Sequence, residues 1–201
     1  MFYVFPRAVA PNICDEIVKD CKQNTLEKAV VADYGHLTEA VALEDSRYDP
    51  NIRKNSVYFI ADKANKINEL AWYFLREANR IQFNYNLDHF QVIQFAEYNK
   101  GEFFNWHQDD AGVSDRNEIR KLSLSLVLSD PNTFEGGELQ FFNGDRPMQD
   151  MGEITGEQVR KDIQAQGSVI VFDSRDFHRV TPVTNGTRHS IVCWCVGGNF
   201  K

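Results

Sequence analysis

His107 and Asp109, near the middle of the chain, have the types and spacing of a pair of metal ligands. They end an apolar run typical of a β-strand, in which side chains two residues apart share a face, so both could bind one cation. The triplet alone is weak evidence, because His and Asp often fall two apart by chance. The distant His178 completes a set of two histidines and one carboxylate. Such a facial triad leaves coordination positions open and suits non-haem Fe(II).

The segments that must position these residues are short and rich in β-formers. Six strand-like segments follow residue 90, at 91–98, 103–109, 121–129, 138–142, 168–173 and 188–196. Several strands after two helices indicate a helix-supported sandwich or barrel, and not alternating βαβ units. We therefore expect a mainly β fold, a double-stranded β-helix (jelly roll), with N-terminal helices packed on one sheet.

The N-terminal part supplies the supporting elements. Residues 2–5 predict an edge strand that ends at Pro6, and residues 56–60 predict another strand. Helical spacing of apolar residues predicts amphipathic helices over 11–23 and about 64–78. Between strands, residues 143–166 are polar, with one helical stretch near 157–163, and are expected to form an insertion.

Length and charge limit the class of protein. The chain has 201 residues, of which 42% are hydrophobic, so we expect a single domain spanning 1–201, with helical support in 1–89 and a catalytic core in about 90–197. The net charge of −7 disfavours nonspecific binding to nucleic acid. No run resembles a signal peptide or a membrane span, so a soluble cytoplasmic protein is expected.

The four cysteines form no C-x-x-C pair, which argues against a structural zinc site or a disulfide framework. Cys14 and Cys21 fall on the first predicted helix, whereas Cys193 and Cys195 share a face of the last strand. We expect all four to be small packing residues in a reducing compartment.

Several fragments together resemble one family. Five fragments follow one another in order over about residues 90–197: Tyr98–Asp109, Phe134–Leu139, Gly167–Phe172, His178–Val183 and Gly186–Arg188. In these fragments the sequence is similar to the 2-oxoglutarate- and Fe(II)-dependent dioxygenases of the prolyl 4-hydroxylase type. Each fragment alone is weak, but their occurrence in order is specific.

The resemblance implies roles for five residues. His107, Asp109 and His178 are the implied iron ligands, Arg188 the residue that binds the distal carboxylate of 2-oxoglutarate, and Tyr98 a second contact to that carboxylate. A guanidinium is a planar, permanently charged clamp for a carboxylate. On the last strand Arg188 shares its face with Ser190, Val192 and Trp194, so it would point inward, where it needs an anionic partner. Simple core packing remains the alternative for Tyr98, and a surface salt bridge for Arg188.

Other polar residues near the motif receive no catalytic role. Asp110 would turn away from the site by strand alternation, and Trp106 and Gln108 are expected to be structural. His36, His89 and His189 have no motif context and are expected to be ordinary surface or packed histidines. The polar segment 24–54, with Tyr48 and Arg53 near its end, is either a lid that helps to choose the substrate or an ordinary solvated loop.

The resemblance implies a dioxygenase that uses Fe(II), 2-oxoglutarate and O2, with ascorbate as a further candidate cofactor. It would hydroxylate an unactivated C–H bond and release succinate and CO2, most simply on a prolyl residue of a peptide or protein. The alternatives are a hydroxylase of a free amino acid or other small molecule, a non-oxidative jelly-roll metalloenzyme, or a binding protein that has lost turnover. Nucleic-acid repair is disfavoured because no basic, aromatic-interleaved patch is present. The sequence implies no particular oligomeric state and no source organism.

Overall fold

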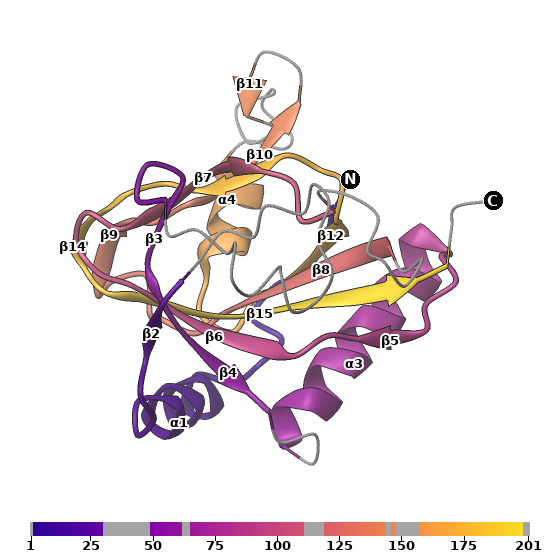
Figure 1. Cartoon of the computed structure of the whole chain (residues 1–201), viewed down its shortest axis with the longest axis horizontal. Helices are drawn as coiled ribbons and strands as arrows, with labels where there is room; N and C mark the ends of the chain where they lie inside the picture. Colours follow the sequence, from indigo (N-terminus) through magenta and orange to yellow (C-terminus); the bar gives the residue numbers. More distant parts are fainter. Residues whose placement is uncertain are drawn as a thin grey trace.

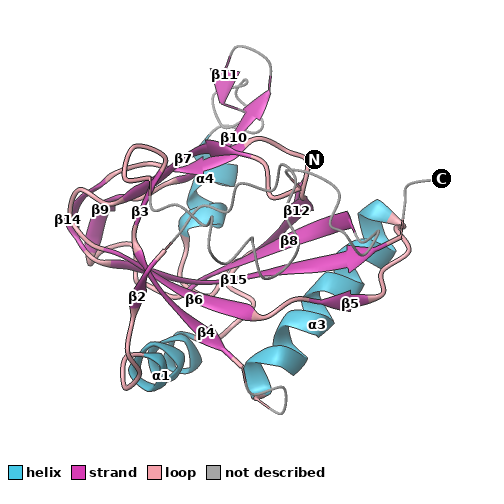
Figure 2. Cartoon of the chain, in the orientation of Figure 1, coloured by secondary structure: helices cyan, strands magenta, loops and turns pink. Residues whose placement is uncertain are grey.

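The computed structural model describes residues 2–29, 49–61, 65–110, 119–143, 146–147 and 157–198. Two antiparallel sheets face each other, and two helices cover the outer side of the larger sheet (Figure 1). Figure 2 shows the same view coloured by secondary structure, in which strands clearly outnumber helices. This is the mainly β, helix-supported architecture that the sequence predicts.

The larger sheet contains β1 (Phe2–Phe5), β2 (Glu27–Lys28), β4 (Ser56–Ile60), β5 (His89–Phe90), β6 (Ile93–Tyr98), β8 (Ile119–Val127), β12 (Val169–Asp173) and β15 (Arg188–Gly197). Its strand order is β1-β12-β8-β15-β6-β4-β2, with β5 paired to β15. β1 therefore lies at an edge of the sheet, as the sequence predicts. β15 pairs with both β6 and β8, which places the C-terminal strand at the centre of the sheet.

The smaller sheet contains β3 (Arg53–Lys54), β7 (Phe103–His107), β10 (Leu139–Asn143), β11 (Arg146–Pro147) and β13 (His178–Val180). Its strand order is β11-β10-β13-β7-β3. A separate two-stranded ribbon is formed by β9 (Phe134–Gly136) and β14 (Val183–Gly186). The helical elements are α1 (Pro11–Cys21), α3 (Lys66–Ala78), the π-helical turn η1 (Asn79–Phe83) and α4 (Glu157–Gln164).

The helices begin where the sequence provides start signals. Pro11 occupies the first turn of α1, where its missing N–H costs no hydrogen bond. The side chain of Asn65 caps α3 by accepting a 2.9 Å hydrogen bond from the backbone N–H of Ile67. The buried faces of both helices pack with one side of the larger sheet in a single apolar cluster. Burial of these faces, and not helix propensity alone, stabilises the two helices.

Strand β8 is buried on both of its faces. Leu122, Leu124 and Leu126 pack in the helix-side cluster, as their alternation predicts. Ser123 and Ser125 point to the opposite side, between the two sheets, and both are buried. A second apolar cluster, which includes Phe141 and Phe172, fills part of this space. The small polar side chains of β8 therefore face the interior where the site lies.

The predicted regular elements are present, with ends shifted by a few residues. The sequence did not predict the short strands β2, β3, β5, β9, β11, β13 and β14, or the π-helical turn. Within the described residues, no helix has the length and apolar character needed to span a membrane.

Candidate iron and 2-oxoglutarate site

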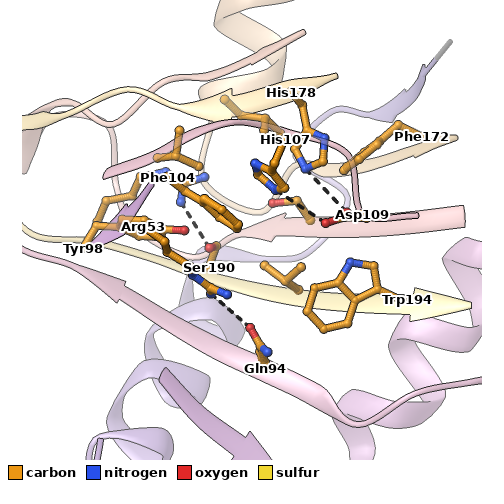
Figure 3. A pocket seen from close by; sticks show the side chains of 15 residues that line it. Arg53, Gln94, Tyr98, Phe104, His107, Asp109, Phe172, His178, Ser190 and Trp194 are labelled. Carbon is orange, nitrogen blue, oxygen red and sulfur yellow. Dashed lines mark hydrogen bonds and ion pairs between the residues drawn. The ribbon is translucent and has the colours of Figure 1, made fainter. Parts of the chain in front are cut away.

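A cavity opens between the two sheets and contains all five residues singled out by the sequence (Figure 3). Its walls come from strands of both sheets and from the residues just after β7. The lining residues are Arg53, Gln94, Tyr98, Phe104, His107, Asp109, Ser125, Leu139, Phe172, His178, Val180, Arg188, Ser190, Val192 and Trp194. The mixture of apolar walls with a few polar groups is typical of a small-molecule site.

His107 and His178 face each other across the β7–β13 ladder. The ladder then shifts, because Phe104 and not Asn105 lies opposite Val180, so β7 carries one extra residue. This β-bulge allows Phe104 and His107, three residues apart, to line the same cavity. Their rings stack with centroids 3.5 Å apart and an interplanar angle of 10°. The phenyl ring therefore fixes the plane of the imidazole.

Asp109 lies just beyond the end of β7, where backbone and side-chain contacts hold it in place. Its backbone N–H donates a 2.9 Å hydrogen bond to the carbonyl oxygen of Ser174. Its carboxylate Oδ2 accepts a 2.6 Å hydrogen bond from the hydroxyl of Ser123, which also lies 2.9 Å from the hydroxyl of Ser174. The carboxylate is thus anchored to β8 and to the loop after β12.

The three side chains form one compact donor set. Nε2 of His107 lies 3.5 Å from Oδ1 of Asp109, and Nε2 of His178 lies 3.5 Å from Oδ2. One ligand atom from each residue falls within 4.8 Å of the other two. This geometry brings together the histidines and the carboxylate that the sequence predicts.

The other ring nitrogens explain why both Nε2 atoms point inward. Nδ1 of His107 lies 2.7 Å from the carbonyl oxygen of Asn105, and Nδ1 of His178 lies 2.9 Å from that of Asp176. A carbonyl oxygen can only accept, so we assign the ring protons to Nδ1, which leaves the Nε2 lone pairs directed at the carboxylate. Two imidazoles and one carboxylate that are directed at one point fit the donor set that Fe(II) takes in facial-triad sites.

The pKa shifts of Asp109 and His178 favour the forms that bind a metal ion. Burial raises the pKa of the Asp109 carboxyl, but the nearby His178 and His107 and the Ser123 hydroxyl outweigh burial and hold the pKa well below its usual value. Burial lowers the pKa of His178 to about 3. At neutral pH the cluster therefore presents an ionised carboxylate and a neutral His178, which are the forms that bind a metal ion.

Arg188 lies at the other end of the cavity. Its side chain is buried, and Nη1 donates a 3.1 Å hydrogen bond to the hydroxyl of Ser190. Its guanidinium carbon lies 5.6 Å from the ring centroid of Tyr98, which is also buried. Among the described residues, no carboxylate lies within ion-pair distance of Arg188. A buried guanidinium that lacks an anion has the chemistry to bind one.

Arg53 is a cavity residue to which the sequence assigned no role at the metal or the cosubstrate. It is buried, its Nε donates to Oδ1 of Asn55 at 2.8 Å, and its Nη2 donates to Oε1 of Gln94 at 3.2 Å. Its guanidinium carbon lies 4.5 Å above the ring of Phe104. The two-residue strand β3 delivers Arg53 to this position, and a strand so short leaves no periodic signal in the sequence. Most of the proposed lid, residues 30–48 with Tyr48, lies outside the described residues.

The excluded residues stay outside the cluster. Asp110 donates its backbone N–H to Ser174 and contributes no atom to the donor set. Strand alternation, which the sequence suggested as the reason for this exclusion, does not apply, because β7 ends at His107 and Asp110 lies beyond the strand. His189 is buried and pairs with Glu97 at 3.0 Å, whereas His89 lies exposed on β5. His36 lies outside the described residues.

Comparison with known proteins decides the family. Residues 93–196 match the family model of the 2OG-Fe(II) oxygenase superfamily. The chain belongs to this superfamily. The matched region runs from β6 to β15 and contains every predicted site residue. This confirms the predicted family, and the cluster of His107, Asp109 and His178 has the ligand types that could hold the iron of such an oxygenase.

Among curated relatives, a PKHD-type hydroxylase of Shewanella sp. (strain MR-7) is 38% identical over 102 residues, which is 50% of this chain and 40% of the relative. A PKHD-type hydroxylase of Synechococcus sp. (strain JA-2-3B'a(2-13)) is 33% identical over 104 residues, 51% of this chain and 41% of the relative. The match thus spans less than half the length of these relatives.

Solved structures share the fold over nearly the whole chain. A Pseudomonas putida prolyl-4-hydroxylase has a TM-score of 0.66 at 20% identity, covering 96% of this chain and 91% of the other. A Trichoplax adhaerens prolyl hydroxylase in complex with a hypoxia inducible factor peptide fragment has a TM-score of 0.69 at 14% identity, covering 96% and 82%. These neighbours confirm the predicted jelly-roll fold.

Proposed function

We propose that this chain is a 2-oxoglutarate- and Fe(II)-dependent dioxygenase that hydroxylates a prolyl residue of a peptide or protein. The observation that carries the proposal is a single cavity that holds both the histidine–carboxylate cluster and the buried Arg188. A non-oxidative metalloenzyme would need the cluster but not the guanidinium. We assign His107, Asp109 and His178 as iron ligands, and Arg188 with Tyr98 as contacts to 2-oxoglutarate.

Each end of the cavity has its own task. Arg188 and the hydroxyl of Ser190, which lie 3.1 Å apart, bind and orient the distal carboxylate of the cosubstrate. Asp109 stays ionised, and the imidazole planes of His107 and His178 are held by their Nδ1 contacts and by Phe104. Preorganised ligands need no rearrangement when the cavity fills.

When bound, Fe(II) and 2-oxoglutarate would supply the oxidising power: one oxygen atom of O2 would enter succinate, formed with loss of CO2, and the other would become the hydroxyl of the product. The apolar walls keep water away from that chemistry. Phe172, Leu139 and Val180 are buried beside the cluster. A dry cavity protects a reactive centre from side reactions.

The choice of a prolyl substrate rests on two supports. The curated relatives are named PKHD-type hydroxylases, and the structural neighbours include prolyl hydroxylases, one of them with a bound peptide. Hydroxylation of a free amino acid uses the same site and remains the alternative.

The test is mass spectrometry after incubation with Fe(II), 2-oxoglutarate, ascorbate and proline-rich peptides in air. Each peptide is paired with a version in which alanine replaces proline, and free proline is assayed in parallel. We expect one oxygen atom to be added at proline in the peptide only. Oxidation of free proline, with no peptide modified, would show that the substrate is a free amino acid and not a peptide.

A further inference from the structure

The indole N–H of Trp194 is a buried donor that has no hydrogen-bond acceptor among the residues the structure describes. Trp194 is 7% exposed, and its side chain lines the cavity. Figure 3 shows the indole nitrogen on the edge of the ring that faces Asp109 and Phe172. A buried donor without a partner costs free energy, and each one in a native protein requires an explanation.

The ring of Trp194 is held in place, so the donor cannot simply turn toward water. The guanidinium carbon of Arg120 lies 4.2 Å from the ring centroid. Arg120 is fixed in turn, because its Nη1 donates to the carbonyl oxygen of Asp109 at 3.2 Å and its Nε to Oε1 of Gln91 at 2.8 Å. The carbonyl oxygen of Trp194 accepts a 2.8 Å hydrogen bond from the backbone of Gln91. The orientation of the indole is therefore built into the fold.

The register of β15 separates this donor from the cosubstrate end. Arg188 bonds to Ser190, four residues before Trp194, which is about 13 Å along a strand. Trp194 lies opposite Ser123, the residue that donates to the Asp109 carboxylate. The indole is thus level with Asp109. A five-carbon dicarboxylate anchored at Arg188 would reach the cluster with its other end. The indole N–H therefore lies where the cosubstrate and the other substrate would meet, and the chemistry of its surroundings decides between them.

The surroundings of the N–H indicate the chemistry of its acceptor. The ring of Phe172 and the side chain of Val192 line the same cavity and are apolar. The nitrogen of a prolyl residue in a peptide carries no N–H, because the pyrrolidine ring takes the place of the hydrogen. The amide bond to that nitrogen therefore offers only a carbonyl oxygen, which is an acceptor. One fixed donor beside apolar walls matches a pyrrolidine ring flanked by a carbonyl oxygen.

Building on the proposed function, we propose that the Trp194 N–H donates a hydrogen bond to a backbone carbonyl oxygen of a prolyl peptide. Trp194 is then a specificity-determining residue that orients the target ring toward the iron site. A hydrogen bond to the carbonyl attached to the proline nitrogen selects an acyl-proline over free proline, whose only oxygen acceptors belong to its carboxylate.

The direct test is the NMR signal of the indole proton in the whole protein, loaded with diamagnetic Zn(II) in place of Fe(II). The chain has three tryptophans, and the variants Trp72→Phe and Trp106→Phe assign the Trp194 signal by difference without altering that residue. We expect 2-oxoglutarate alone to leave the signal in place. A proline-rich peptide should then move it downfield and slow its exchange with solvent.

The outcomes separate this inference from the proposed function. A peptide that is hydroxylated without moving the Trp194 signal would overturn the hydrogen bond and leave the function standing. A shift caused by 2-oxoglutarate alone would assign the donor to the cosubstrate and also overturn it. A protein that neither binds nor oxidises any peptide would overturn both.

Kinetics of Trp194→Phe supply a second measurement, because this variant keeps an aromatic ring and loses only the N–H and part of the ring area. We expect kcat/KM for the peptide to fall about tenfold, the value of one hydrogen bond, through KM for the peptide and not KM for 2-oxoglutarate. Trp72→Phe, on α3, is the control and should match the wild type. An unchanged peptide KM in Trp194→Phe would contradict the inference.

Discussion

The hydroxyl of Ser123, on strand β8, lies 2.6 Å from Oδ2 of Asp109 and donates a hydrogen bond to it. This contact fixes the orientation of the carboxylate assigned to iron. Ser123→Ala should therefore lower the affinity for metal about 10- to 100-fold, as loss of an outer-sphere partner does. Anaerobic titration with Co(II) measures the effect. Ser125→Ala is the matched control, since Ser125 is buried on the same face of β8. Equal affinities in the two variants would contradict the role of Ser123.

Arg188→Met should raise the free energy of unfolding while it abolishes the binding of 2-oxoglutarate. The Arg188 guanidinium is buried, and burial lowers its pKa, which reflects the cost of keeping the charge out of water. An apolar side chain of similar length removes that cost, so the free energy of unfolding should rise by about 1 kcal/mol or more. In the wild type, 2-oxoglutarate at 100 times its Kd should add about 2.7 kcal/mol, and in Arg188→Met it should add nothing. Thermal unfolding with and without 2-oxoglutarate measures both quantities. Equal stabilisation by 2-oxoglutarate in both proteins would exclude Arg188 as the anchor.

Gly137 packs against the side chain of Arg188. Its φ is +62°, and a Cβ at this position would lie 2.9 Å from Cδ of Arg188. Gly137→Ala should displace the guanidinium and weaken 2-oxoglutarate binding about tenfold, in addition to destabilising the fold by about 1 kcal/mol through backbone strain.

Gly101→Ala provides the control for backbone strain. Gly101 also has a positive φ, +82°, but a Cβ there would meet nothing within 4 Å. Both alanine variants should lose stability, and isothermal titration should find weaker 2-oxoglutarate binding only in Gly137→Ala. Normal 2-oxoglutarate affinity in Gly137→Ala would mean that Arg188 adjusts freely.

The four cysteines should be unreactive in the folded protein. All four are buried and free, and burial raises the pKa to about 11 for Cys14 and Cys21 and to about 12 for Cys195. Labelling with a thiol reagent at pH 8 should therefore proceed only as fast as the protein unfolds. Rapid labelling of the native protein would contradict the packing role.

The same shifts make stability depend on pH. In the unfolded chain the thiols ionise near their ordinary pKa of 9.0, whereas the folded protein holds the proton of Cys14 to about 11. The stabilisation is fully present below pH 9 and is lost as the pH rises toward 11. Urea unfolding should give a lower free energy of unfolding at pH 10.5 than at pH 8. In a variant with alanine at all four cysteine positions, this difference should be smaller.

The long elements could be predicted because their patterns are regular. The apolar stripe of α3 and the alternation of Leu122, Leu124 and Leu126 each specify a buried face, and the structure confirms both. The side of β8 that faces the smaller sheet was harder to predict. Ser123 in a leucine strand is compatible with a solvent-exposed face, and only the packing of a second sheet shows that it is buried.

The site residues divide in the same way. The residue types of His107, Asp109 and His178, and the two-residue spacing of the first two, predict a set of metal ligands. Arg53 lies on a two-residue strand, too short for any periodic signal. The bulge that brings Phe104 beside His107 arises from the pairing of β7 with β13, which local sequence does not encode.

Asp109 and Asp110 offer the most direct test of the central claim, that this cavity is an Fe(II)- and 2-oxoglutarate-dependent centre. The two carboxylates are adjacent in sequence, but Asp109 belongs to the donor cluster and Asp110 does not. The measurement is succinate formation from 2-oxoglutarate in air, with and without Fe(II), in the wild type, Asp109→Ala and Asp110→Ala. We predict iron-dependent succinate in the wild type and in Asp110→Ala, and a loss of at least about a hundredfold in Asp109→Ala, beyond that typical of outer-sphere partners. Iron-dependent succinate that survives in Asp109→Ala would contradict the account.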